Sequence, residues 1–393
     1  MRYISRHERF GRTVFNPADF THAYTSEEQH SDLKVKHQVE EKNNPVTGTE
    51  GILEAPIRVY YDITMACNLR CKTCLNSSGE PDKDELDTEQ SLRTIDGLTS
   101  AGVFEVRLSG GEPTFRDDWG LILNHAKERG LIISLNTNGV FSDRTLKKLI
   151  ELKPDETTVS LDGARDLHDR IRGPGKYDRS CAAIQAMNEA GLRVTINSVM
   201  TASTSMADIE ELTAVADRYC QDISFFHARP LGRAQNIPEE ILQYKNLDDK
   251  MAWAESIRSK YPHLIIRTRS SSIKKSGISP SIGLGLVRGG SDGFTRLNIM
   301  SNGDIYAGGC VRYVNENVRE EQKLGNIVDE SFCIKRVWHH SARLWAIRET
   351  SRRLQEQCDQ CPEYQGKCHG FTPEMYQYGL ANSGDPFCIM RTK

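Results

Sequence analysis

The segment Arg58–Leu75, RVYYDITMACNLRCKTCL, holds three cysteines in a C-x3-C-x2-C run: Cys67, Cys71 and Cys74. Three thiolates cannot complete a tetrahedral zinc site, because structural zinc takes four ligands. They can hold three irons of a [4Fe–4S] cubane and leave the fourth iron open. The run therefore favours a cluster with one exchangeable position over half of a zinc knuckle or a chance grouping.

The residues around the cysteines predict where they lie in the fold. Arg58–Thr64 is rich in β-branched and aromatic residues, which is typical of a strand. A second predicted strand, Glu105–Ser109, leads directly into the Gly-Gly-Glu-Pro element that starts at Gly110. Glycines let a backbone approach a ligand closely, and Glu112 and exposed backbone carbonyls can accept hydrogen bonds from an ammonium group. Both motifs thus follow the C-terminal end of a strand, where barrel active sites are built.

Residues 56 to about 235 alternate predicted strands with predicted helices. Four more strands are expected at Leu131–Asn136, Glu156–Leu161, Arg193–Met200 and Asp222–His227. Helices are expected over 87–101, 118–129, 142–152, 177–190 and 206–219. Strands separated by helices imply a parallel sheet with right-handed crossovers, so the fold class is α/β.

The three-cysteine run and the GGEP element together resemble the radical SAM enzymes. This resemblance implies that the open iron of a [4Fe–4S] cluster on Cys67, Cys71 and Cys74 binds the amino and carboxylate groups of S-adenosylmethionine (SAM). One-electron cleavage of a C–S bond in SAM then releases a 5′-deoxyadenosyl radical, while the protein holds the parts and excludes water. The resemblance also implies a partial (β/α)6 TIM barrel that is open on one side.

Polar residues at the ends of the predicted strands complete the expected cofactor site. By resemblance, this site comprises Gly110, Gly111, Glu112, Pro113, Asn136, Asn138, Ser160, Asp162, Arg172, Asn197 and Leu231. Ser160 and Asp162 are expected near the ribose and carboxylate side of the cofactor. Arg172 is expected to pair with the cofactor carboxylate, because a guanidinium binds carboxylates bidentately. Where the family usually has an aromatic residue before the third cysteine, this chain has Thr73, which weakens adenine stacking.

A second cysteine group lies near the C-terminus. Its members are Cys358, Cys361, Cys368 and Cys388, and four thiolates fit either zinc or a [4Fe–4S] cluster. A predicted hairpin over 295–306 precedes this group and leads to Cys310. Hairpin and cysteines resemble the SPASM extension, an α+β region that holds auxiliary iron–sulfur clusters, so iron is favoured.

The SPASM pattern is incomplete here. Thr372 stands where a full SPASM domain has another cysteine, and Cys310 lacks an upstream partner. We therefore expect one auxiliary [4Fe–4S] cluster, on the four cysteines from Cys358 to Cys388. The alternative, as in the shorter twitch version, replaces Cys388 with Cys310.

The expected organisation is an N-terminal extension (1–55), a radical SAM core (56–235), a bridge (236–293) and a SPASM-like region (294–393). The extension has a possible hairpin over Ile4–Phe15 and is too short for a complete winged-helix domain. We expect it to wrap around the core or to lack order, with a peptide-binding remnant as the alternative. A helix with a solvated face is expected over Arg343–Arg353, and Cys181, Cys220 and Cys333 are expected to be buried structural cysteines.

Composition bounds the partners. The chain has 393 residues, a net charge of −3 and no long basic stripe, so nucleic-acid binding is not expected. It has no long apolar run and no apolar signal-peptide core at the N-terminus, so no membrane association is expected. Eleven cysteines in such a chain indicate reduced thiols and metal clusters in the cytoplasm.

The resemblance is greatest to SPASM maturases of ribosomal peptides, of the mycofactocin type. It implies hydrogen abstraction and oxidative modification of a peptide side chain: a cross-link, a decarboxylation or a dehydrogenation. A flavodoxin or ferredoxin would supply electrons. Sulfatase maturases carry a carboxylate beside the cysteine that corresponds to Cys310, whereas this chain has Val311 and Arg312.

Two other functions stay open from sequence alone. One is a dehydrogenase or epimerase that acts on a small molecule such as an aminoglycoside or nucleoside. The other is an iron–sulfur electron carrier, which the GGEP element disfavours because a carrier needs no SAM site. The catalytic acid or base cannot be assigned from the sequence.

Overall fold

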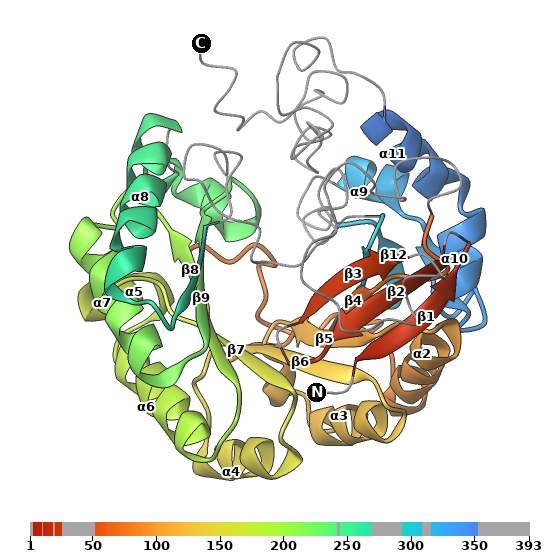
Figure 1. Ribbon diagram of the computed structural model, residues 1–393, viewed down its shortest axis with the longest axis horizontal. Helices are drawn as coiled ribbons and strands as arrows, with labels where there is room; N and C mark the ends of the chain where they lie inside the picture. The colour runs from red at the N-terminus through yellow and green to blue at the C-terminus, as the bar shows by residue number, and fades with distance from the viewer. Residues whose placement is uncertain are drawn as a thin grey trace.

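The computed structural model describes residues 3–9, 11–18, 20–25, 52–241, 244–268, 293–308 and 316–352. Within these residues, one curved sheet of ten strands has helices packed along its outer side (Figure 1). The strand order is β10-β9-β8-β7-β6-β5-β4-β11-β12-β13. No helix in this part of the chain is long and apolar enough to cross a membrane.

The strands of this sheet are β4 (Arg58–Thr64), β5 (Glu105–Gly110), β6 (Ile132–Thr137), β7 (Glu156–Ser160), β8 (Val194–Met200), β9 (Asp222–His227), β10 (Ile265–Thr268), β11 (Arg296–Ile299), β12 (Asp304–Tyr306) and β13 (Gly325–Asn326). The helices are α2 (Thr88–Ala101), α3 (Trp119–Glu128), α4 (Asp143–Leu152), α5 (Arg165–Arg172), α6 (Lys176–Glu189), α7 (Met206–Tyr219), α8 (Tyr244–Ser256), α9 (Glu316–Gln322), α10 (Ile334–His340) and α11 (Ala342–Arg352).

Strands β4 to β9 pair in parallel in chain order, which confirms the predicted α/β partial barrel. The sheet also extends beyond these six strands. β10 adds in parallel beside β9, and β11 adds in parallel beside β4. The predicted hairpin, β11 and β12, therefore continues the barrel sheet. The predicted boundaries at 235 and 293 stay predictions, although strands on both sides of them share this sheet.

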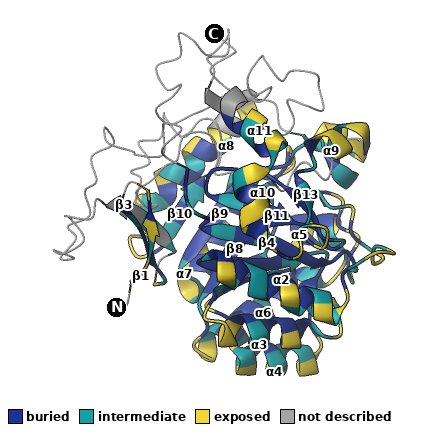
Figure 2. Cartoon of the chain, turned by 90° about the vertical axis from the view of Figure 1, so that its right-hand side faces the viewer, coloured by how far each residue is buried: buried dark blue, intermediate teal, exposed yellow. Residues whose placement is uncertain are grey.

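Local sequence explains where the helices begin and end. In α2, Asp87 and Gln90 form a capping box, and Gly102 ends the helix in the left-handed conformation with φ of 83°. A second capping box, Ser205 with Asp208, starts α7. Helix α5 was not predicted, because its sequence RDLHDRIR is mostly charged. Figure 2 shows exposed residues on the outward faces of helices such as α3 and α4, with the strands buried behind them.

A separate three-stranded antiparallel sheet forms from β1 (Ile4–Glu8), β2 (Gly11–Asn16) and β3 (Thr21–Thr25). Its first two strands are the predicted hairpin, with Glu8 opposite Gly11. Phe15 is fully buried and stacks on Phe104 with ring centroids 5.6 Å apart. Because Phe104 directly precedes β5, this sheet packs at the N-terminal end of the barrel strands, away from the cysteine loop.

Two side-chain predictions were wrong. The arginine-rich helix α11 is not simply solvated, since Arg348 is 0% exposed. Its guanidinium donates hydrogen bonds to the carbonyls of Gly293 (2.8 Å) and Trp338 (2.9 Å). Cys333 is exposed rather than buried, because it precedes α10 at the surface, and Cys181 and Cys220 are half-buried.

Candidate cluster and cofactor site

The cysteine loop and the GGEP element lie side by side. Strands β4 and β5 are neighbours, with Thr64 opposite Gly110 in the parallel register. Beyond the strands, the Gly111 N–H donates to the Thr64 carbonyl (2.8 Å), and the Glu112 N–H donates to the Ala66 carbonyl (2.9 Å). The chain thus brings Cys67 and the GGEP backbone to the same end of the barrel.

The two glycines permit this close backbone approach. A Cβ on Gly110 would lie 2.1 Å from the Thr64 carbonyl oxygen, and one on Gly111 would lie 2.2 Å from that of Ala66. Real Cβ atoms do not come so close, so any side chain here would push the two loops apart. In this structure the glycines therefore join two loops of the protein, whereas the sequence suggested that they approach a ligand.

The three thiols of the loop are free and partly withdrawn from solvent. Cys71 is 9% exposed, and Cys67 and Cys74 are half-buried beside Leu69 and Val140. Burial raises the pKa of Cys67 to about 11 and also raises the pKa of Cys71. Because iron binds thiolates, cluster assembly must displace these protons.

This donor set fits a [4Fe–4S] cluster. Within the described residues, no three His, Cys, Asp or Glu side chains converge on a single metal ion. A cubane does not need such convergence, since its ligands bind separate iron atoms. Three thiols on one loop, next to the GGEP backbone, match a cluster with one iron left for SAM.

Arg233 anchors the cysteine loop, and the sequence analysis missed it. Its Nε donates to the Cys71 carbonyl (2.7 Å) and its Nη1 to the Ser78 carbonyl (2.8 Å). Its backbone N–H donates to the Cys74 carbonyl (3.0 Å). Gly232 permits this docking, because it has a φ of 56° and a Cβ there would lie 2.1 Å from the Leu75 carbonyl oxygen. A glycine before an arginine was the only sequence signal.

The Glu112 carboxylate points into the protein. It is 1% exposed and accepts hydrogen bonds from the Thr137 hydroxyl (2.9 Å), the Asn138 N–H (2.8 Å) and the Thr114 hydroxyl (2.7 Å). Burial raises the pKa of Glu112. The side chain thus holds the end of β6 next to the GGEP turn, which Pro113 begins as a short 3-10 helix. Of the predicted acceptors for an ammonium group, this leaves the backbone carbonyls of the GGEP element, and their contact with the group stays a prediction.

Asn136, within β6, and Asn138, just after it, differ in their surroundings. Asn138 donates to the Asn68 side chain (2.8 Å) and lies with its Nδ2 3.9 Å from the Cys67 sulfur. Asn136, two residues earlier, instead donates to the Ser109 hydroxyl (3.4 Å). Asn138 therefore borders the cysteine loop directly, and Asn136 faces the end of β5.

Ser160 is the last residue of β7 and Asp162 follows it, whereas Asn197 lies within β8 and Arg172 is the last residue of α5. Ser160 and Asn197 are half-buried and face each other in the register of β7 and β8. The Arg172 Nε forms an ion pair with Asp162 (2.7 Å), and its Nη1 lies 4.0 Å from the Cys71 sulfur. The predicted carboxylate partner of Arg172 was that of SAM; in this structure its partner is Asp162.

The remaining predicted site residues are less informative. Leu231 is fully buried against Met300 and Tyr306, with Leu75 packed beside them, so it joins the cysteine loop to the C-terminal hairpin. Its cofactor contact stays a prediction. Cys310, Cys358, Cys361, Cys368 and Cys388 lie outside the described residues.

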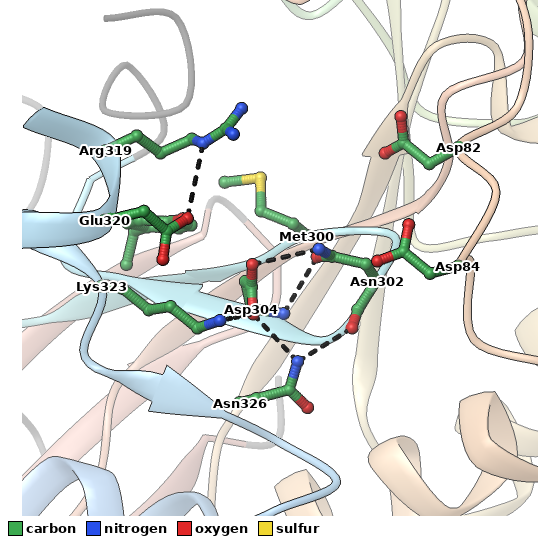
Figure 3. Close-up of a pocket in the computed structure, with 10 residues that line it drawn as sticks. Asp82, Asp84, Met300, Asn302, Asp304, Arg319, Glu320, Lys323 and Asn326 are labelled. Carbon is green, nitrogen blue, oxygen red and sulfur yellow. Dashed lines mark hydrogen bonds and ion pairs between the residues drawn. The ribbon is translucent and has the colours of Figure 1, made fainter. Parts of the chain in front are cut away.

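A pocket of about 450 Å³ lies beside the C-terminal hairpin (Figure 3). Asp304 is central to it and accepts hydrogen bonds from Asn302 (3.0 Å) and Asn326 (2.9 Å). Lys323 forms an ion pair with the same carboxylate at 2.6 Å. These contacts fasten the hairpin to α9 and β13.

Comparison with known proteins identifies the class of this chain. Residues 61–216 match the radical SAM superfamily, and residues 291–362 match SPASM, an iron–sulfur cluster-binding domain. The chain belongs to the radical SAM superfamily. It is an enzyme of the type that uses a [4Fe–4S] cluster and SAM, and the SPASM match adds an auxiliary iron–sulfur cluster domain.

Particular relatives narrow the comparison. The chain is 30% identical over 346 residues to the mycofactocin maturase MftC of Mycolicibacterium smegmatis, covering 86% of this chain and 83% of the relative. It is 27% identical over 361 residues to an AdoMet-dependent heme synthase of Methanosarcina barkeri, covering 86% of this chain and 97% of the relative.

Solved structures show the same fold. Streptococcus suis SuiB bound to the precursor peptide SuiA has a TM-score of 0.80 with 20% identity, covering 98% of both chains. The predicted radical SAM fold, the predicted SPASM extension and the expected cofactors, iron–sulfur clusters and SAM, are confirmed by the family matches and the relatives, whereas the predicted domain boundaries stay predictions.

Proposed function

We propose that this enzyme oxidatively modifies a side chain of a ribosomally made peptide. The observation that carries the proposal is the similarity to mycofactocin maturase MftC, which extends over 86% of this chain. The fold likeness to SuiB, whose structure is known with a precursor peptide, agrees with this substrate class. The proposed setting is the cytoplasm, with a flavodoxin or ferredoxin as reductant.

In this proposal, Cys67, Cys71 and Cys74 hold the catalytic cluster, and the backbone of Gly110 to Pro113 borders bound SAM. When bound, the cluster and SAM together supply a 5′-deoxyadenosyl radical that removes a hydrogen atom from the substrate. The protein contributes position: Arg233 and Gly79 fix the cysteine loop by hydrogen bonds to its backbone. Asn138 limits the movement of the same loop through Asn68.

The proposed cofactor residues at the later strand ends are Asn136, Ser160, Asp162, Arg172, Asn197 and Leu231. Asn136, Ser160 and Asp162 lie at or next to the C-terminal ends of β6 and β7, where ligands bind in barrels. Asn197 lies beside Ser160, Arg172 forms an ion pair with Asp162, and Leu231 follows β9. The proposed ligands of the auxiliary cluster are Cys358, Cys361, Cys368 and Cys388, with Cys310 as the alternative to Cys388. The count of four thiols supports this set, and the SPASM match over residues 291–362 includes Cys310, Cys358 and Cys361.

The test is anaerobic incubation of the reconstituted enzyme with SAM, a reductant and the short peptides encoded beside its gene. Mass spectrometry should show a peptide that has lost two hydrogens, or carbon dioxide and two hydrogens. Deuterium placed on the modified side chain should appear in 5′-deoxyadenosine. Rapid SAM cleavage with every peptide unchanged would contradict the peptide assignment.

A second candidate is a small-molecule oxidation, because the heme synthase of M. barkeri also matches 86% of this chain. Iron coproporphyrin III, a compound named in another relative of this chain, can be incubated in place of the peptide to test this candidate. A mass change in the porphyrin, with the peptides left unmodified, would favour the small-molecule substrate.

A further inference from the structure

Arg172 lies between a buried carboxylate and one of the cluster thiols. It is the last residue of α5, and its side chain is 11% exposed. Its Nε is used by Asp162 at 2.7 Å, and its Nη1 lies 4.0 Å from the Cys71 sulfur, within range of an N–H to sulfur hydrogen bond. A guanidinium stays protonated in proteins, so this contact places a permanent positive charge beside Cys71.

Asp162 is itself held in place, because its second carboxylate oxygen and its backbone N–H both form hydrogen bonds. Its second oxygen accepts a hydrogen bond from the Val199 N–H on β8 (2.8 Å). Its own N–H donates to His168 Nδ1 (3.1 Å), and His168 is fully buried in α5. Burial and the nearby Arg172 lower the pKa of His168 to about 4, so this acceptor stays neutral. Two strands and one helix thus fix the position of Arg172.

Cys67 has no cation at hydrogen-bond distance in the described part of the chain. Cys67 is contacted by the Leu69 N–H (3.4 Å) and by the neutral Asn138 side chain (3.9 Å). Lys72, which follows Cys71 in sequence, is exposed. Arg172 therefore contacts one thiol of the set, Cys71, while its charge also acts on Cys74, and Arg233 is a second cation near Cys71.

We propose that Arg172, positioned by Asp162, raises the reduction potential of the cluster held by Cys67, Cys71 and Cys74. The inference rests on the proposed assignment of these thiols as ligands. One electron from the external reductant adds one negative charge to the cluster, and the guanidinium stabilises that added charge through Cys71. Hydrogen bonds to cluster sulfurs and local charge are known determinants of such potentials. In this proposal Arg172 tunes the reduction of the cluster, in addition to any contact with the SAM carboxylate.

The experiment is a redox titration of the full reconstituted chain, followed by electron paramagnetic resonance, without SAM or substrate. The variants are Arg172→Gln and Arg172→Lys, and the matched control is Arg170→Gln, which removes an exposed charge from the same helix. The cluster that responds spectrally to later SAM addition is the one scored, and the auxiliary cluster serves as an internal control.

At the wild-type midpoint potential, Arg172→Gln should lower the ratio of reduced to oxidised cluster about tenfold. For a one-electron couple, this corresponds to a fall of about 59 mV in the midpoint potential. Arg172→Lys should shift it in the same direction by less, since a lysine paired with Asp162 cannot also reach Cys71. Arg170→Gln and the auxiliary cluster should not shift.

An unchanged midpoint in Arg172→Gln with full iron content would overturn the proposal, including when SAM binding is weakened. Should Arg172→Gln fail to hold iron, Arg172→Lys decides: a lowered midpoint supports the proposal, and the wild-type value overturns it. Because no substrate is present, failure here leaves the peptide assignment untouched.

Discussion

Replacing Arg233 with methionine should loosen the cysteine loop while leaving the barrel folded. The variant loses two hydrogen bonds from a charged donor, to the carbonyls of Cys71 and Ser78. Such bonds contribute about 1.5–3 kcal/mol each, and Arg233 is half-buried, so we take the lower end: about 3 kcal/mol for the pair. Since 1.4 kcal/mol is a factor of ten, the opened loop should become about 100-fold more populated.

Amide hydrogen exchange of the cluster-free protein measures this opening. Cys67 and Gly79 donate their N–H groups within the base of the loop, so their protection reports its closure. In Arg233→Met, peptides that cover residues 67–79 should lose protection about 100-fold, and iron retention after reconstitution should fall. Peptides from β6 to β8 should keep their protection.

Lys72→Met is the matched control, because it removes an exposed positive charge from the same loop without touching its backbone carbonyls. Its exchange should equal that of the wild type. The reasoning would be refuted by equal protection of residues 67–79 in Arg233→Met and wild type, or by equal loss in both variants.

Two further changes test the packing of the site and of the C-terminal region. Arg348→Met removes the hydrogen bonds to the buried Gly293 and Trp338 carbonyls and should lower the free energy of unfolding by about 3 kcal/mol. The control Arg336→Met, at the surface, should change it by less than about 0.5 kcal/mol. Similar denaturation midpoints for the two variants would argue against a role for the buried charge. Gly111→Ala places a methyl group 2.2 Å from the Ala66 carbonyl oxygen and should sharply reduce the iron content of the reconstituted protein. In the control Gly130→Ala the methyl group meets no atom within 4 Å, so the free energy of unfolding should fall by only about 1–2 kcal/mol. Full iron content in Gly111→Ala would show that the loops can separate freely.

The parallel strands and the two main motifs could be predicted, because each depends on a local pattern. β-branched runs such as Arg58–Thr64 predicted the strands, and the cysteine spacing predicted the cluster. Helix α5 could not be predicted in the same way, since tertiary contacts of Leu167 and Ile171 stabilise a mostly charged segment. Because Arg172 is the last residue of α5, its contacts with Asp162 and Cys71 could not be predicted either.

Side-chain direction was the other limit. Arg233 contacts Cys71 across 162 positions of sequence, and no periodicity links two such residues. Glu112 was expected to accept a hydrogen bond from a ligand ammonium group, but in the structure its carboxylate accepts hydrogen bonds from Thr137 and Asn138 in the interior. Arg348 follows the same rule, because two distant carbonyls make its burial possible.

The three thiols after β4 hold the catalytic cluster in the proposed function, and 5′-deoxyadenosine formation tests this assignment. Wild-type protein and the triple variant Cys67→Ala, Cys71→Ala, Cys74→Ala would be reconstituted anaerobically, reduced and supplied with SAM. The wild type should release 5′-deoxyadenosine and methionine, and the variant should release neither while retaining its auxiliary iron. Equal amounts of 5′-deoxyadenosine from both proteins would contradict the assignment of this loop as the cluster site.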